Sequence, residues 1–287
     1  MVSIDRMDLE DVGDNPKRLA AAVVEQAGIS SGHVPIREIA FASDIREIKR
    51  APLISFEGAL VTTPEKSVGT ILVKEGVSEK RTRFTIAHEL GHFLIGYHRP
   101  VDGRFECTSK DMNVRQFKPS DRAAKMEVEA NRFAAELLMP RKIVVPWIKK
   151  IREIDLSQVL SLATDYRVSK EAAARRFVEL IDEPVAIVFS KDGLVRYWLN
   201  NEDFPSLVLR PHSPLPEGTV SAKFQNSPGS ISQTEEASQE SWLRREVDGV
   251  LSEQVLLQRD GYRMTLLSCE LEDVDDEDVW EAPRFRR

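Results

Sequence analysis

The stretch that decides the fold of this chain is residues 84–94, which have the sequence FTIAHELGHFL. Its apolar residues recur at the spacing of one helical face, so the stretch predicts an α-helix. Residues four apart lie on the same face of a helix, and His88 and His92 therefore point their imidazoles in the same direction. From this spacing we expect His88 and His92 to bind one metal ion.

Zinc fits this pattern because it accepts imidazole ligands in tetrahedral geometry and keeps its fourth position for water when three protein ligands hold it. Glu89 lies about 100° further round the helix, beside that open position. A carboxylate placed there can act as a general base on the metal-bound water. His-Glu-x-x-His is a short motif that also occurs by chance, but its apolar helical setting favours a metal site.

A second helix is predicted over residues 120–138, where apolar residues again recur at helical spacing, and Pro140 closes it. A zinc site with two histidines needs a third protein ligand, often a glutamate from a later helix. This helix offers Glu127, Glu129 and Glu136. Glu127 and Glu129 are about 200° apart round the helix, so only one of them can face the metal.

Two blocks of the sequence, TIAHELGH at residues 85–92 and EVEANRFAAELLMP at residues 127–140, resemble the ImmA/IrrE family of zinc metallopeptidases. Close similarity covers residues 70–180. The resemblance implies a zincin-like, gluzincin-type metallopeptidase domain.

The resemblance also implies roles for individual residues. Zn²⁺ would be held by His88, His92 and Glu127, with Glu89 as the general base. Asn131, one helical turn after Glu127, would orient a ligand. The family's activity implies a protein substrate, an XRE-type helix-turn-helix repressor whose site-specific cleavage inside the cell derepresses its target genes. Residues 99–119 and the acidic C-terminal half do not align with the family, so the substrate does not follow from the sequence.

Two further residues near the motif, His98 and Cys107, are alternative ligands. His98 lies six residues after His92, where metzincins place a third ligand, but the glycine of that pattern is one place late at Gly96. We therefore interpret His98 as a surface or substrate-side residue. Cys107 is interpreted as an ordinary loop cysteine, with an inhibitory thiolate on the zinc as the alternative. His33 and His212 have no motif around them and are interpreted as structural.

Composition narrows the class of protein. The chain has 287 residues, enough for one large or two modest domains. No apolar run approaches the roughly 20 residues needed to span a bilayer, and the N-terminal residues lack a secretory signal pattern. We therefore expect a cytoplasmic protein, with Cys107 and Cys269 as free thiols.

The formal charge of −7 is unevenly distributed. Residues 1–183 hold 29 Lys and Arg against 28 Asp and Glu, a net of +1, whereas residues 184–287 hold 11 against 19, a net of −8. The acidic half includes an acidic run at residues 270–278, which argues against contact with DNA by that half.

The N-terminal part predicts an α+β order of helix, small sheet and metal-bearing helix. Residues 1–13 are expected to be loosely ordered, and residues 99–119 to form a loop bordering the site. Asn15 and Pro16 predict the start of a helix. The remaining predicted elements are helices at 16–27 and 36–42 and strands at 45–53, 59–63 and 69–74. We expect residues 69–74 to be the edge strand that would hold an extended peptide.

Residues 156–180 predict a helix, a tight turn and a second helix capped by Ser169. Lys170, Arg175 and Arg176 could touch DNA phosphates. The alternative is a helical pair that only supports the metal-bearing helices. We favour support, because Glu171 and Glu179 balance the charge, and we expect no direct binding to DNA.

These patterns predict a peptidase domain over residues 1–183 and a smaller, acidic, β-rich domain over residues 184–287, with a mobile loop at residues 226–239. The predicted function is zinc-dependent peptide hydrolysis. The alternative is a non-catalytic regulator that uses the same fold to bind a repressor or DNA. The presence of Glu89 favours hydrolysis, because a scaffold needs no carboxylate there. The role of the second domain, the activating signal and the oligomeric state do not follow from the sequence.

Overall fold

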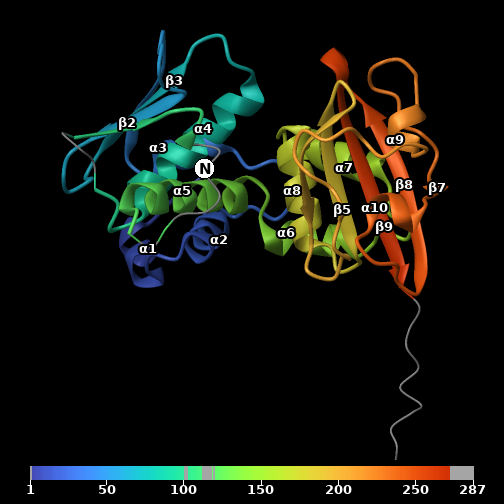
Figure 1. The fold of residues 1–287 in the computed structure, drawn as a ribbon. Helices are drawn as coiled ribbons and strands as arrows, with labels where there is room; N and C mark the ends of the chain where they lie inside the picture. The colour runs from blue at the N-terminus through green and yellow to red at the C-terminus, as the bar shows by residue number, and fades with distance from the viewer. Residues whose placement is uncertain (1, 100–102, 112–117, 119, 272–287) are drawn as a thin grey trace, which may run out of the picture. The chain divides into compact units, whose positions relative to one another are not determined.

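The computed structural model describes residues 2–99, 103–111, 118 and 120–271. The chain divides into two compact units (Figure 1). The N-terminal unit comprises Met1–Glu153 and Ser157–Ile181, and the C-terminal unit comprises Ile154–Leu156 and Asp182–Arg287. Each unit combines helices with a small sheet, so the predicted α+β class is confirmed. Among the described residues, no helix is both long and apolar enough to cross a membrane.

The N-terminal sheet has four strands in the order β1-β3-β2-β4. The strands are β1 (Ile45–Ala51), β2 (Gly58–Thr62), β3 (Gly69–Lys74) and β4 (Arg104–Cys107). Strand β3 pairs with β1 in parallel and with β2 antiparallel, which places it inside the sheet. The expectation that residues 69–74 form the edge strand is therefore wrong, and the edge beside β2 belongs to β4.

Strand β4 lies in the segment that the sequence predicted to be a loop. It pairs antiparallel with β2, with Phe105 opposite Leu60 and Cys107 opposite Gly58. Along β4, Phe105 and Cys107 are buried while the two alternate residues are exposed, as the two-residue period of a strand requires. Residues 100–102, 112–117 and 119 of the predicted loop lie outside the described residues.

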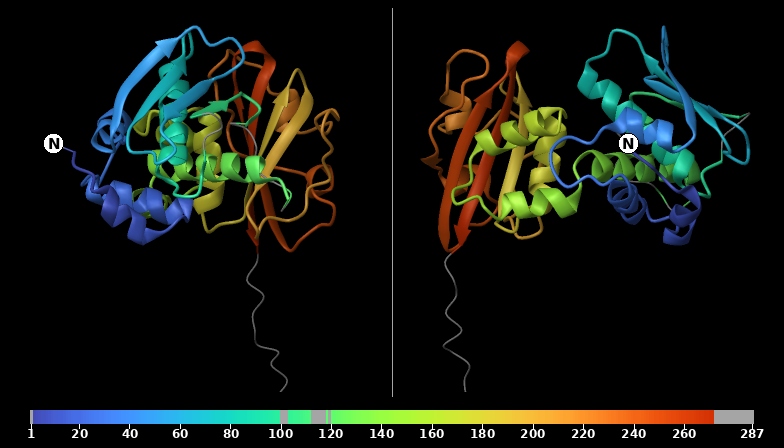
Figure 2. Two further views of the ribbon diagram at one scale, coloured as in Figure 1. Left: turned by 90° about the vertical axis from the view of Figure 1, so that its left-hand side faces the viewer. Right: turned by 180° about the vertical axis from the view of Figure 1, so that it is seen from behind.

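Helices that pack against one another cover one side of this sheet (Figures 1 and 2). Helix α4 (Glu79–Leu94) packs against β2 and β3, helix α5 (Arg122–Leu138) packs against α4, and helix α2 (Pro16–Gln26) packs against α5. Helix α3 (Ile36–Ala42) also contacts α4. Side-chain caps fix where the three stacked helices begin, at Ser78 for α4, Asp121 for α5 and Asn15 for α2.

The N-terminal residues are ordered, contrary to the prediction for residues 1–13. They form helix α1 (Arg6–Val12), which is capped by Asp5, whose side chain accepts a hydrogen bond from the backbone of Met7. Arg6 donates to the backbone oxygen of Lys66 at 2.8 Å, and its guanidinium lies 4.5 Å from the ring centre of Phe93. Contacts with distant residues therefore hold a segment whose own sequence carries little structural signal.

The predicted helical pair consists of α7 (Leu156–Asp165) and α8 (Lys170–Leu180), and Ser169 caps α8 as predicted. Arg176 on α8 is buried and cannot reach a phosphate. Its guanidinium donates to the backbone oxygen of Met139 at 2.9 Å and to the carboxylates of Glu136 at 2.5 Å and Glu179 at 2.9 Å. Arg176 therefore joins α8 to the end of α5.

The C-terminal unit is built on an antiparallel sheet in the order β6-β5-β9-β8-β7. Its strands are β5 (Val185–Lys191), β6 (Leu194–Asn200), β7 (Glu235–Glu236), β8 (Gly249–Leu257) and β9 (Tyr262–Leu271). Asp192 and Gly193 join β5 to β6 with φ values of 51° and 79°, the left-handed pair that a tight hairpin turn requires.

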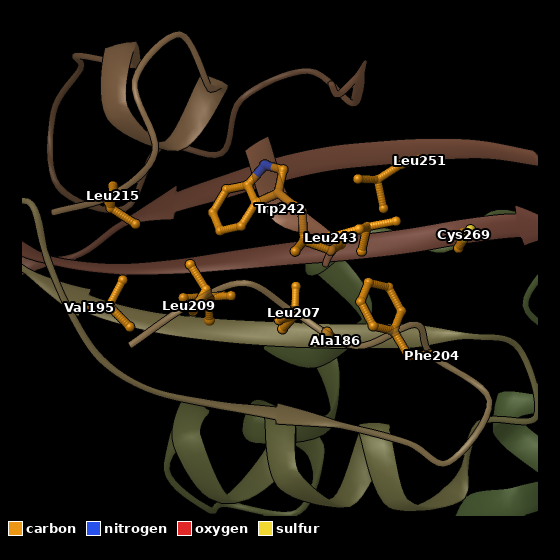
Figure 3. Close-up of a cluster of buried hydrophobic side chains, with 12 residues drawn as sticks. Ala186, Val195, Phe204, Leu207, Leu209, Leu215, Trp242, Leu243, Leu251 and Cys269 are labelled. Carbon is orange, nitrogen blue, oxygen red and sulfur yellow. The ribbon is translucent and has the colours of Figure 1, made fainter. Parts of the chain in front are cut away.

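Trp242 lies at the centre of an apolar cluster in the C-terminal unit (Figure 3). It ends the short helix α10 (Gln239–Trp242), and its indole donates to the buried Glu253 at 3.2 Å. The same carboxylate accepts from the backbone of Val220 and Ser221 at the start of α9 (Val220–Lys223). These hydrogen bonds of Glu253 tie α9, α10 and β8 of the C-terminal unit together, which indicates a structural role.

Residues 226–239, predicted to be a mobile loop, contain strand β7 and a bridge between Ile231 and Leu256. They are held against β8, whose backbone pairs with β7. In the predicted acidic run at residues 270–278, the residues from 272 onward lie outside the described part of the chain.

The buried ion pair between Arg176 and Glu136 generates a stability prediction. Glu136→Ala leaves the guanidinium buried with one partner fewer, and should reduce the free energy of unfolding by about 3–5 kcal/mol. Lys142→Ala removes an exposed pair with Glu25 in the same unit and should cost at most about 1 kcal/mol. Urea denaturation of both variants measures the difference. Equal losses would contradict the role of the buried pair.

Candidate metal site

Helix α4 brings the two motif histidines together. His88 and His92 are one turn apart, fully buried, and their Nε2 atoms are 3.1 Å apart. Nine residues of α4 between positions 85 and 93 are buried, because the helix lies between the sheet and α5. The two imidazoles therefore face the protein interior at a fixed separation.

Helix α5 supplies the third group, because it approaches α4 closely at Gly91. A Cβ atom at Gly91 would lie 3.1 Å from the Phe133 ring and 3.3 Å from the Cα of Ala130, closer than most side chains tolerate. On the same helix, Glu127 places its carboxylate oxygens 3.2 Å from Nε2 of His88 and 3.4 Å from Nε2 of His92.

Strand β4 supplies a fourth group. The Sγ atom of Cys107 lies 3.7 Å from Nε2 of His92 and 3.9 Å from Oε1 of Glu127. The ligand atoms of His88, His92, Cys107 and Glu127 all lie within 4.8 Å of one another. We call these four residues the ligand cluster. The interpretation of Cys107 as an ordinary loop cysteine is wrong, since it is a buried strand residue in this cluster.

The ligand cluster fits a bound metal ion. Two imidazole nitrogens, a carboxylate and a sulfur are the ligand types that zinc takes in proteins. Burial alone would raise the pKa of Glu127, but the neighbouring imidazoles of His88 and His92 hold that pKa below its usual range. Burial also lowers the pKa of His92, against the opposing effect of Glu127. The cluster thus presents an ionised carboxylate and a neutral imidazole, the states in which both bind metals.

Asn131 orients the first imidazole. Its Oδ1 atom lies 3.1 Å from Nδ1 of His88, while its Nδ2 donates to the backbone oxygen of Asp111 at 3.1 Å. With the amide so placed, Nδ1 of His88 carries the proton and donates it to the amide oxygen. The lone pair on Nε2 of His88 is then free for a metal.

His98 orients the second imidazole. It is fully buried, so its interpretation as a surface residue is wrong. Its Nδ1 lies 3.0 Å from Nδ1 of His92 and its Nε2 lies 3.3 Å from Glu129. Burial, together with the charges of His92 and Lys66, lowers the pKa of His98 to about 2, so the ring is neutral. His92 can therefore donate to His98, which donates in turn to Glu129.

The other glutamates of helix α5 face different partners. The carboxylate of Glu129 also accepts a hydrogen bond from the hydroxyl of Tyr97 and lies 3.8 Å from Lys125. Glu136 is paired with Arg176. His33 and His212, the remaining histidines, do not belong to the ligand cluster.

Lys66 is a residue near the site that the sequence did not indicate. It is buried with a φ of 49°, and its ammonium donates to the backbone oxygens of His92 at 3.1 Å and Ile95 at 2.5 Å. Burial and the neighbouring Arg99 and Arg6 lower its pKa to about 8. A cation at this place satisfies the carbonyls at the end of α4 and favours its helix dipole.

Glu89 lies beside the ligand cluster and is fully buried. Its Oε2 atom accepts a hydrogen bond from Cys107 over 3.8 Å, and its Oε1 atom has no hydrogen-bond partner among the described residues. Burial and the nearby carboxylate of Glu127 raise the pKa of Glu89 well above its usual value. A buried carboxyl group whose pKa is raised is suited to take up and release a proton as a general base.

Part of the chain matches a known protein family. Residues 47–178 match a peptidase family model described as the IrrE N-terminal-like domain. Over these residues the chain is similar to that family. The match spans the strands and helices that carry the ligand cluster and Glu89, and the predicted family resemblance is confirmed.

Two further comparisons concern the whole chain. No curated protein matches it. Among solved structures, it is similar to one described as a Mycobacterium tuberculosis transcriptional regulator, with a TM-score of 0.58 and 14% sequence identity. That match covers 91% of this chain and 78% of the other. At this identity the similarity shows a shared fold.

The geometry predicts which glutamate binds the metal. Purified protein should contain one zinc ion per chain, and Glu127→Ala should lose most of it, because one negatively charged ligand disappears. Glu129→Ala is the matched control on the same helix. It should keep its zinc at saturation, with an affinity weaker by about 10- to 100-fold, since it supports His92 only through His98. Elemental analysis measures both. Full zinc content in Glu127→Ala with loss in Glu129→Ala would contradict the assignment.

Proposed function

We propose that this protein is a zinc-dependent endopeptidase that cleaves a protein substrate in the cytoplasm. The observation that carries the proposal is the position of Glu89, a fully buried carboxylate with one oxygen unused, next to the ligand cluster. Burying a carboxyl group without full hydrogen bonding costs stability, so a functional role explains its presence better than a structural one.

In this proposal His88, His92 and Glu127 hold the zinc. When bound, the ion supplies a Lewis acid that polarises the scissile carbonyl and lowers the pKa of a water molecule to about 7. Glu89 takes the proton of the attacking water and delivers it to the leaving amine. Asn131 and His98 keep the imidazoles of His88 and His92 in the tautomers that this chemistry needs.

The sheet supports an extended polypeptide as the substrate. Strand β4 lies at the edge of the four-stranded sheet, and its last residue, Cys107, belongs to the ligand cluster. Its backbone groups facing away from β2 pair with no other described strand. A substrate segment can add there as a further strand, which would carry its peptide bonds past the metal site.

The class of substrate comes from the family. A helix-turn-helix repressor of the XRE type, whose cleavage derepresses genes, is the substrate that the ImmA/IrrE resemblance implies. The similar M. tuberculosis structure, described as a transcriptional regulator, agrees with a link to gene control.

The competing function is a non-catalytic regulator that binds DNA through the helical pair α7 and α8. The structure disfavours it because Arg176 is buried among Glu136, Glu179 and Met139. Arg175 also lies 3.1 Å from Glu171 in an ion pair within α8. The pair therefore has little free positive charge with which to bind phosphates.

We predict that Glu89→Gln separates metal binding from catalysis. Glutamine preserves size but accepts no proton at neutral pH, so cleavage should fall by about 10²-fold or more. Zinc content and thermal stability should stay near those of the parent, because Glu89 is not a ligand. Glu25→Gln, the same change at an exposed position of the same unit, is the control and should cleave like the parent. Unchanged cleavage by Glu89→Gln would contradict the peptidase assignment.

A second prediction concerns DNA. Because Arg175 and Arg176 of the helical pair are engaged in ion pairs, the purified protein should not bind promoter fragments specifically. Gel-shift titration at two salt concentrations tests this. Nanomolar binding to one fragment that weakens steeply with salt, and that Lys170→Ala abolishes, would favour the regulator instead.

A further inference from the structure

Cys107 occupies the place of a fourth ligand. A tetrahedral zinc with ligands at the usual distances has edges of about 3.3 Å between nitrogen or oxygen ligands and about 3.6 Å between sulfur and either. The Nε2 atoms of His88 and His92 are 3.1 Å apart, and Glu127 places Oε2 3.2 Å from His88 and Oε1 3.4 Å from His92. The sulfur of Cys107 lies 3.7 Å from Nε2 of His92, 3.9 Å from Oε1 of Glu127 and within 4.8 Å of the ligand atom of His88. The sulfur therefore lies close to the place that a fourth ligand would take.

The position of Glu89 supports the same conclusion. A general base faces the water on the open coordination position. Here the group in front of Glu89 is the sulfur of Cys107, 3.8 Å from its Oε2 atom, while its Oε1 atom remains without a hydrogen bond among the described residues. The sulfur thus stands where the proposed mechanism requires the water.

The backbone holds Cys107 in this position. Its carbonyl accepts a hydrogen bond from the backbone of Glu57 at 2.9 Å. Directly after it, the backbone and hydroxyl of Thr108 both donate to Asp111, at 2.9 and 2.7 Å. The carbonyl of Asp111 accepts from Asn131, which also orients His88. One hydrogen-bond chain therefore links the cysteine strand to a metal-binding imidazole.

The competing explanation is that Cys107 merely fills the core, as buried cysteines often do. Cys269 is a cysteine that fills a core in this way. It lies in the apolar cluster of the C-terminal unit among residues such as Leu251 and Ala186 (Figure 3). Cys107 instead has its sulfur within 4 Å of an imidazole nitrogen and two carboxylates. Its surroundings are those of a ligand.

We propose that Cys107 is the fourth protein ligand of the metal in the resting protein and keeps the peptidase latent. The proposal rests on the metal site of the proposed function. With four protein ligands the site has no open position, as in structural zinc sites. Activation breaks one metal–sulfur bond, a water molecule takes the vacated position, and the released thiolate takes up one proton from solvent. No electrons are transferred.

The test is X-ray absorption at the zinc edge on the full chain. The parent should show one sulfur at about 2.3 Å and three nitrogen or oxygen ligands at about 2.0–2.2 Å. Cobalt in place of zinc should give a thiolate-to-metal charge-transfer band. Cys107→Ser should lose both signals, with circular dichroism confirming that it folds. Cys269→Ser, the other cysteine of the chain, is the matched control and should keep them.

The outcomes separate the two proposals. A parent that binds zinc through nitrogen and oxygen alone overturns the role of Cys107 and leaves the peptidase assignment standing. A parent that binds no zinc overturns both. The measurement on the parent does not depend on any variant folding.

Removal of the Cys107 thiol should therefore raise the peptidase activity. On an extended peptide that the parent cleaves, Cys107→Ala and Cys107→Ser should raise kcat tenfold or more, because the fourth position is then open to water. Their zinc dissociation constants should rise at least tenfold. Cys269→Ser should change neither value. A lower kcat in both Cys107 variants, with zinc loaded, would contradict latency.

Discussion

The site depends on the close approach of helices α4 and α5 at Gly91. A residue without a side chain there lets the Phe133 ring and the backbone of Ala130 pack against the helix that carries both histidines. One turn before Ala130, Glu127 then reaches Nε2 of His88 and His92 together. A larger residue at Gly91 would push α5 away and withdraw the carboxylate, because buried helices have little free space between them.

Helix packing sets the distances between the ligand atoms, and hydrogen bonds set the tautomers of the two imidazoles. An imidazole binds a metal through one nitrogen only if the other holds the proton, and the structure arranges this twice by different means. Asn131 accepts from His88, and the neutral ring of His98 accepts from His92. Phe105 also stacks on His92 with ring centres 4.6 Å apart, so the sheet limits the rotation of that ring. These neighbours belong to α5, to the turn after α4 and to β4, which makes the site a product of the whole N-terminal unit.

The parts of the structure that the sequence predicted well are those with local signals. The helical spacing around His88, the cap at Ser169 and the helix start at Asn15 and Pro16 need only neighbouring residues, and all three are present. Strand β4 and helix α1 were missed because their order comes from distant partners, β2 for the strand and the contacts of Arg6 for the helix. His98 and Cys107 were misjudged for the same reason. Their burial depends on how the chain returns to α4, which spacing along the sequence does not encode.

The central claim is that the two histidines and Glu127 surround a zinc ion beside Glu89. A crystal of the full chain grown with zinc, measured on both sides of the zinc absorption edge, tests it most directly. We expect one anomalous peak per chain, about 2.0–2.3 Å from the ligand atoms of His88, His92 and Glu127. An empty cluster with a peak elsewhere on the chain, or a peak bound by Glu129 in place of Glu127, would contradict it.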